Sequence, residues 1–394
     1  MMKNKMTAVV AVMAVFTLAI CFIILGSTSL ELMTALNINE GQFGTLVMGL
    51  FLTSCIVQIF VGPLVDKIGY KPVAIMGFVV TSISMFLLAF STSFSVALLA
   101  CILLGVGAMS LNTVGNTLIP VVLFEGKDPS RASNFGNAFF GLGYTLTPLL
   151  IVFMLEVLNL NYTSALMIIG ILSLVFLLFV FKADFPNVSP GFKFSMALKV
   201  IIKPAVIVAA LAEFCFTSLD STMGAWIKKL MEELFGGGLD ASSATKAGLV
   251  LSLFGLAMMA GRFLFSTIKN LTAISSKMIV LMSGLALAAV LMMIFVKTPL
   301  GGIFSVILAG VAFGPIFPLI VGITFSKFDP SLYGSIFGIV FAFGMLGGTF
   351  VPKLIGNLSV GSTIQQSLPI AAIIAGILFF ISFFIGRVGK PKKE

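Results

Sequence analysis

Two acidic residues, Glu213 and Asp220, lie inside one long apolar stretch at residues 203–228. Seven residues at about 100° each bring both carboxyls back to one face of a helix, with Thr217 between them. Because an ionised carboxylate inside a bilayer costs about 2.5 kcal/mol or more, such an acid must be protonated, paired or hydrated. We therefore predict a coupling site for a cation, proton or sodium, at Glu213, Thr217 and Asp220. The alternatives are a helix-to-helix hydrogen bond by Glu213 and an interfacial position for Asp220.

Amide side chains form a second group. Asn112 and Asn116 are four residues apart, and Asn137 and Tyr144 are seven apart, so each pair shares a helical face. Carboxamides offer donors and acceptors without charge, which suits the hydroxyls of a neutral polar solute such as a sugar. We predict that these four residues contact a small-molecule substrate. The alternative is that the Asn side chains only join helices to each other.

Three more polar residues belong to apolar stretches. Gln58 lies in the middle of one stretch and is added to the predicted substrate contacts. Trp226 is added too, because its ring could stack on a sugar, although a Trp near the end of a membrane helix commonly lies in the interfacial aromatic belt. Glu31 follows GSTSL, and a membrane-surface position is favoured over a position in a central cavity.

The composition indicates that the helices holding these residues lie in a lipid bilayer. The chain has 394 residues, 59% hydrophobic and 9% charged, against roughly 25% charged in soluble domains. It contains no His, and its four Cys lack metal-binding spacing. We therefore expect no cofactor and no metal, and we predict that the chain is not an enzyme.

The apolar stretches predict an all-α, polytopic membrane protein with twelve transmembrane helices. Most of the 23 Lys and Arg fall at the termini and in the even-numbered loops, and five (Lys228, Lys229, Lys246, Lys297 and Lys353) fall on the other side. The positive-inside rule then predicts a cell (inner) membrane protein with both termini cytoplasmic. The net charge of +9 follows from this topology and implies no nucleic-acid partner. The predicted spans are residues 7–32, 42–64, 72–92, 94–124, 133–158, 162–181, 203–228, 245–268, 277–296, 300–325, 333–355 and 366–386.

The two halves of the chain resemble each other. DPSRASNFG (128–136) matches DPSLYGSIFG (329–338), and ILLGVG (102–107) matches ILAGVAFG (307–314). A polar stretch separates the halves. We predict pseudo-symmetric six-helix bundles at 1–182 and 203–394, joined by a cytoplasmic linker at 183–202, in a monomer. Such a repeat is expected of a transporter that rocks two halves about a site at the membrane midplane.

Between the second and third predicted spans, the sequence GPLVDKIGYKP (62–72) resembles the conserved loop motif of the major facilitator superfamily. That resemblance implies a conformational latch formed by Gly62, Asp66, Lys67, Gly69 and Lys71. The second-half counterpart GRFLFSTIKN (261–270) keeps a glycine and Arg262 but has no acid, which predicts a weaker latch. Within the superfamily, NFGNAFFGLGYTLTPLL (134–150) and GPIFP (314–318) are similar to the fucose-permease group of sugar:cation symporters.

Three hypotheses about function follow. The first is a secondary active transporter that works by alternating access, as a proton- or sodium-coupled symporter of a neutral polar solute. The second is a cation-coupled exporter of hydrophobic or cationic compounds, which the 40 Phe and 21 Met would suit. The third, of another class, is a transport-incompetent membrane sensor or a membrane enzyme.

Overall fold

The computed structural model describes residues 2–123, 129–186, 202–236, 241–268, 271–325, 327–328 and 333–388, and within these ranges the regular elements are helices. The first half of the chain contains α1 (Met2–Ser27), α2 (Ser29–Leu36), α3 (Glu40–Ile68), α4 (Tyr70–Ala89), α5 (Phe94–Val122), α6 (Pro129–Val152), the π-helical turn η2 (Phe153–Val157), α7 (Tyr162–Val175) and α8 (Leu177–Lys182). The second half contains α10 (Pro204–Leu234), α11 (Ala241–Thr267), α12 (Leu271–Phe295), α13 (Pro299–Phe325), α14 (Tyr333–Ser359), α15 (Ile364–Ser367) and α16 (Pro369–Ile385).

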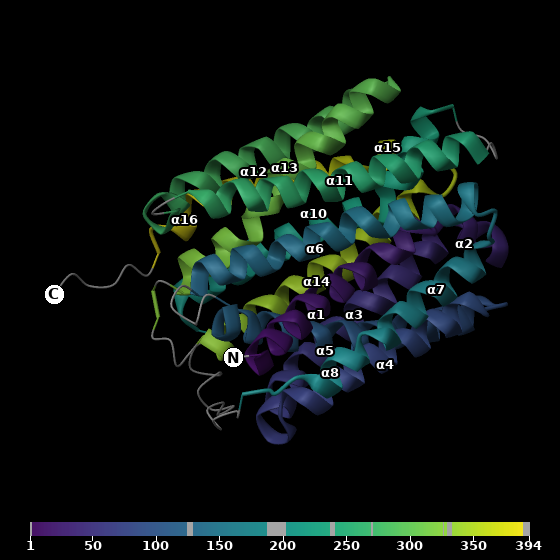
Figure 1. Cartoon of the computed structure of the whole chain (residues 1–394). Coiled ribbons are helices and arrows are strands. Elements are labelled where there is room, and N and C mark those ends of the chain that lie inside the picture. Colours follow the sequence, from purple (N-terminus) through teal and green to yellow (C-terminus); the bar gives the residue numbers. More distant parts are fainter. Residues whose placement is uncertain are drawn as a thin grey trace.

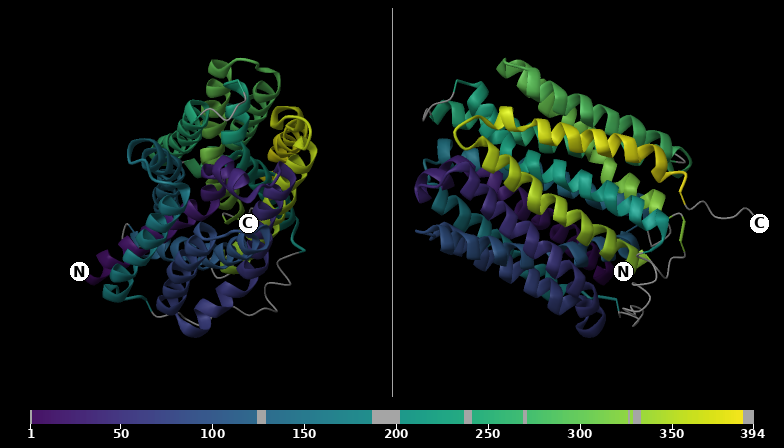
Figure 2. Two further views of the ribbon diagram at one scale, coloured as in Figure 1. Left: turned by 90° about the vertical axis from the view of Figure 1, so that its right-hand side faces the viewer. Right: turned by 180° about the vertical axis from the view of Figure 1, so that it is seen from behind.

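Eleven segments of the described chain are long and apolar enough to cross a membrane, with α7 and α8 together forming one of them. The shorter apolar helix α16 makes the twelfth, so the predicted all-helical architecture is confirmed. The helices run roughly alongside one another, and α1 begins at the same end of the bundle at which α16 finishes (Figures 1 and 2). We call this the terminal end and the opposite one the distal end. The cytoplasmic location of the terminal end stays a prediction.

Three helix pairs make most of the contacts between the first half and the second. The most extensive contacts between the halves are those of α3 with α14 and of α6 with α11, and α1 also packs on α10. The second span of each half therefore packs against the fifth span of the other, as a pseudo-two-fold relation requires. The predicted boundaries of the two bundles agree with this pairing but stay a prediction, and residues 187–201 of the linker lie outside the described residues.

Small residues let the two halves approach closely at the distal end. A Cβ added to Gly26 of α1 would lie 1.7 Å from the carbonyl oxygen of Gly224 in α10. Side chains larger than hydrogen cannot occupy this position, because the two helices meet backbone to backbone. Close helix approach through glycine is common inside membranes, where the surrounding lipid is as apolar as the helices themselves.

Candidate transport site between the two halves

Helix α10 places the predicted cation site on its buried face. The side chains of Glu213 and Asp220 are 1% and 7% exposed, and Thr217 is also buried. The Thr217 hydroxyl donates to Oε1 of Glu213 over 3.3 Å. Within the described residues, Oε2 of Glu213 and Oδ1 of Asp220 have no hydrogen-bond partner. Two buried carboxyl groups therefore each keep one oxygen available for a proton or another cation.

Asp220 also contacts the other half of the molecule. Its Oδ2 accepts a hydrogen bond from the Tyr144 hydroxyl of α6 over 3.4 Å. The Tyr144 ring is buried and stacks on Phe140 with 4.8 Å between ring centroids. This position differs from the interfacial one weighed as the alternative for Asp220, because the carboxyl lies between α10 and α6. The link joins a predicted cation-site residue to a predicted substrate-site residue.

The predicted amide residues form one continuous chain across α3, α5 and α6. Asn137 donates to Asn116 over 3.3 Å, and Asn116 donates to Asn112 over 2.8 Å. Asn112 in turn donates to Gln58 over 3.0 Å. The spacing predicted a shared face for Asn112 and Asn116, and helix packing adds Gln58 and Asn137 to them. In this conformation the four amides bond to one another, as the helix-joining alternative describes. Their contact with a substrate stays a prediction.

Arg262, predicted to belong to the weaker second latch, is buried at the boundary between the halves. Its Nη1 donates to the backbone carbonyl of Asn137 over 2.8 Å, and its Nε donates to that of Gly314 over 3.0 Å. The Gly314 carbonyl is available because Pro318, four residues later, has no N–H to donate to it. The guanidinium carbon also lies 5.0 Å from the centroid of the Phe140 ring. Arg262 therefore connects α11 to α6 and α13.

The other latch residues make contacts within the first half. Gly69 separates α3 from α4 with φ +84°, a conformation that favours glycine. Lys71 donates to the Phe181 carbonyl of α8 over 3.3 Å, and Lys67 is exposed. The side chain of Asp66 lies outside the described residues, and Gly62 belongs to α3. The latch predicted for residues 62–71 stays a prediction.

Trp226 does not lie in an aromatic belt facing lipid. It is 1% exposed, and its Nε1 donates to the Pro352 carbonyl of α14 over 3.1 Å. Its ring meets Phe43 of α3 edge-on, with 5.2 Å between centroids. Trp226 therefore fills the contact between α10, α14 and α3 near the distal end, and a role in stacking on a sugar stays a prediction.

Sequence reasoning missed one ion pair. Lys228, the last residue of the predicted span 203–228, is a buried residue of α10 that pairs with Glu31. The carboxylate of Glu31, whose side chain is 22% exposed, faces this lysine across the boundary between the halves, and its expected membrane-surface position stays a prediction. No local pattern could have found the pair, because its members are 197 residues apart.

A family model of the Major Facilitator Superfamily matches residues 10–352. The chain belongs to this superfamily. The resemblance inferred from residues 62–72 is thereby confirmed, and the chain is a multi-pass membrane protein of a family whose members are transporters.

Two groups of relatives differ in how much of the chain they match. The quinolone resistance protein NorA of Staphylococcus aureus (strain MRSA252) is 28% identical over 186 residues, which are 45% of this chain and 47% of the relative. The match thus spans about half the length of NorA. The protein TsgA homolog of Buchnera aphidicola subsp. Schizaphis graminum is 21% identical over 345 residues, which are 86% of this chain and 85% of the relative.

Proposed function

We propose that this major facilitator is a cation-coupled symporter of a small neutral polar solute, with Glu213 and Asp220 as the cation-binding carboxyls. The observation that supports coupling most directly is that both groups are buried between the halves and each keeps one oxygen without a partner among the described residues. Leaving two ionised carboxylates in this position is costly, so a bound proton or sodium ion would stabilise the buried site.

The hydrogen bond between Tyr144 and Asp220 provides a route from cation binding to movement of the halves. An ionised Asp220 accepts the tyrosine hydroxyl strongly, because hydrogen bonds to charged acceptors are about twice as strong as neutral ones. A cation bound at the free Oδ1 neutralises the carboxylate, so Oδ2 accepts the tyrosine hydroxyl less strongly and the link between α10 and α6 weakens. Binding of the coupling ion therefore changes the relative stability of conformations that keep or break this contact.

The amide chain supports a neutral polar solute. Gln58, Asn112, Asn116 and Asn137 are bonded to one another in this conformation. A solute with several hydroxyls could replace those bonds one for one, because hydroxyls both donate and accept. Exchange between internal and solute hydrogen bonds would leave no amide unsatisfied in either state, which limits the cost of binding.

Export of hydrophobic or cationic compounds is the second candidate. It is favoured by the partial match to NorA, a protein named for quinolone resistance. It is also favoured by a run of aromatic rings that crosses from one half to the other: Phe51, Phe22, Phe140, Tyr144, Phe254 and Phe313, with neighbouring centroids 4.8 to 6.3 Å apart. Flat apolar compounds could bind against such rings, with one acid to receive a positive charge.

Flux measurements in reconstituted vesicles test the coupling site. Exchanging Glu213 for Gln keeps the side-chain shape but removes the titratable carboxyl, so we expect loss of gradient-driven uptake with solute counterflow retained. Glu156→Gln is the matched control, because this carboxyl is exposed at the end of the fifth span. Unchanged active uptake by Glu213→Gln would remove that residue from the coupling mechanism.

The same vesicles separate the two solute classes. Proton or sodium entry that starts when a sugar is added supports symport of a neutral polar solute. Extrusion of a cationic dye that requires Glu213, together with no cation entry on addition of sugars, supports export instead. Cysteine labelling at the start of α1, from one side of the membrane at a time, tests the predicted cytoplasmic position of the termini.

A further inference from the structure

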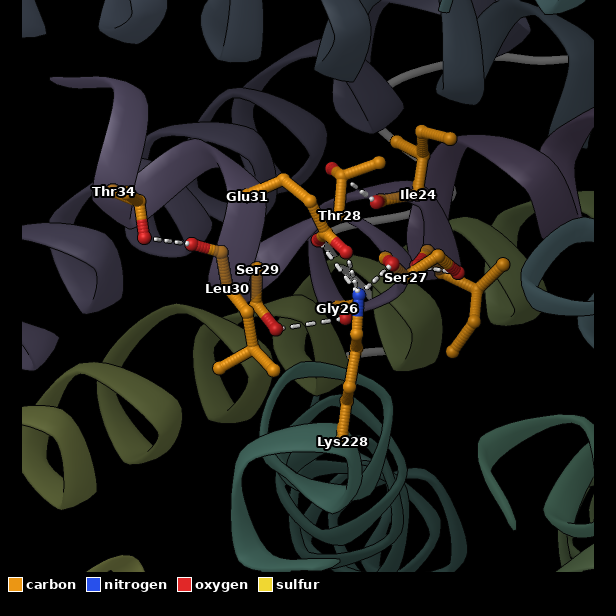
Figure 3. A network of polar contacts seen from close by, with 10 residues as sticks. Ile24, Gly26, Ser27, Thr28, Ser29, Leu30, Glu31, Thr34 and Lys228 are labelled. Atoms are coloured by element: carbon orange, nitrogen blue, oxygen red, sulfur yellow. Dashed lines mark hydrogen bonds and ion pairs between the residues drawn. The ribbon is translucent and has the colours of Figure 1, made fainter. Parts of the chain in front are cut away.

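An ion pair closes the contact between α1, α2 and α10 at the distal end (Figure 3). The Lys228 ammonium donates to both carboxylate oxygens of Glu31, over 2.7 and 2.6 Å, and to the Ser27 carbonyl over 2.8 Å. Its three protons are thus all used by the first half of the chain, although Lys228 itself belongs to the second. This ion pair crosses from one half of the chain to the other.

The break between α1 and α2 prepares the site for the lysine. Helix α1 ends at Ser27 and α2 begins at Ser29, and the three hydroxyls of Ser27, Thr28 and Ser29 donate back to carbonyls of the preceding turn. Such back-bonding is known to bend helices. The bend turns the Ser27 carbonyl and the Glu31 carboxylate toward the same point, where Lys228 meets them (Figure 3).

The two partners are buried to different degrees. The Lys228 side chain is 2% exposed, whereas that of Glu31 is 22% exposed. Removing one partner of a buried pair leaves an uncompensated charge, and this cost grows with the burial of the charge that is left behind. Loss of the glutamate charge should therefore destabilise the closed distal end more than loss of the lysine charge.

We propose that Glu31 and Lys228 form an ion-pair gate, whose making and breaking closes and opens the path between the halves at the distal end. When the halves part there, both charges enter water, and hydration stabilises the separated ions in the open state. An apolar contact in the same place would receive no such stabilisation on opening. The gate goes beyond the proposed function, because it requires only the family's alternating movement and not any particular solute or coupling ion.

The gate can be tested by a distance measurement without solute. Thr92→Cys, in the turn between α4 and α5, and Lys297→Cys, in the turn between α12 and α13, place spin labels on exposed distal positions of the two halves. The four native cysteines, all buried, are first replaced by alanine. In the full-length protein we expect short distances to dominate. Glu31→Gln should raise the ratio of long to short distances about tenfold or more.

The second variant and the control make the test specific. Lys228→Met should raise the same ratio by a smaller factor, because the glutamate left behind is partly exposed. Lys229→Met is the control: Lys229 pairs with Glu232 three residues away on the same helix, over 3.2 Å, and should leave the ratio unchanged. Equal ratios for Glu31→Gln and Lys229→Met would overturn the proposal. If Glu31→Gln does not fold, the Lys228→Met ratio decides: a rise supports the gate, and the wild-type value overturns it.

Discussion

Replacing Gly26 by alanine should prevent the distal end from closing. The added methyl would lie 1.7 Å from the Gly224 oxygen and 2.8 Å from its carbonyl carbon, whereas real Cβ atoms essentially never come within 3.0 Å of another heavy atom. Relief needs a separation of at least about 1.3 Å, the difference between 1.7 and 3.0 Å. Because the obstacle is backbone, no side chain can rotate away. Overpacking of this severity costs about 3 kcal/mol, the upper end of the usual range, or more than a hundredfold in population.

Opening of the distal end removes the clash without unfolding the bundle, so the cost should appear as a shift between conformations. Gly26→Ala should therefore convert the short Thr92–Lys297 label distance into a long one. Gly376→Ala makes the same chemical change in α16, where no atom lies within 4 Å of the added methyl, and should leave the distance unchanged. If both variants keep the short distance, α1 and α10 do not meet backbone to backbone, and the reasoning fails.

Three further substitutions test single contacts. Trp226→Phe removes the donor to the Pro352 carbonyl, so we expect a stability loss of about 1 kcal/mol, measured as a lower thermal unfolding midpoint in detergent. Asn112→Leu interrupts the amide chain and leaves the Gln58 oxygen without its donor, at a cost of about 1–3 kcal/mol, and sugar binding should weaken if the solute uses these amides. Arg262→Lys keeps the charge but cannot reproduce the two carbonyl bonds, so uptake should fall markedly; wild-type uptake would show that charge alone suffices.

Local spacing and hydropathy predicted most of the fold and part of the site. Twelve apolar stretches gave the helices, because a bilayer admits few other ways to satisfy the backbone. The seven-residue interval placed Glu213 and Asp220 on one face of a helix, and both are buried in the structure. The interval of four between Asn112 and Asn116 likewise corresponds to a direct hydrogen bond. These successes depend only on helix geometry within one element.

Contacts between helices far apart in the chain could not be predicted from the sequence. Lys228 was predicted as the last residue of the span 203–228, and only the approach of α1 explains its burial against Glu31. Arg262 was predicted as part of a latch motif, but the proline that frees the Gly314 carbonyl is 56 positions away and on another helix. Trp226 looked like a lipid-facing anchor because hydropathy does not tell a neighbouring helix from lipid. In each case the missing information was which helix packs next to which.

The pairing of Glu31 with Lys228 has an electrical consequence. Moving one elementary charge through the full membrane potential is worth about 2.3 kcal/mol per 100 mV, so voltage acts on a transporter wherever its movements carry net charge along the membrane normal. A lysine and a glutamate that separate sideways, at nearly equal depth, carry equal and opposite charges and little net current. If the proposed coupling ion binds at the carboxyls of α10, membrane voltage should act on this protein mainly there and hardly at the distal closure.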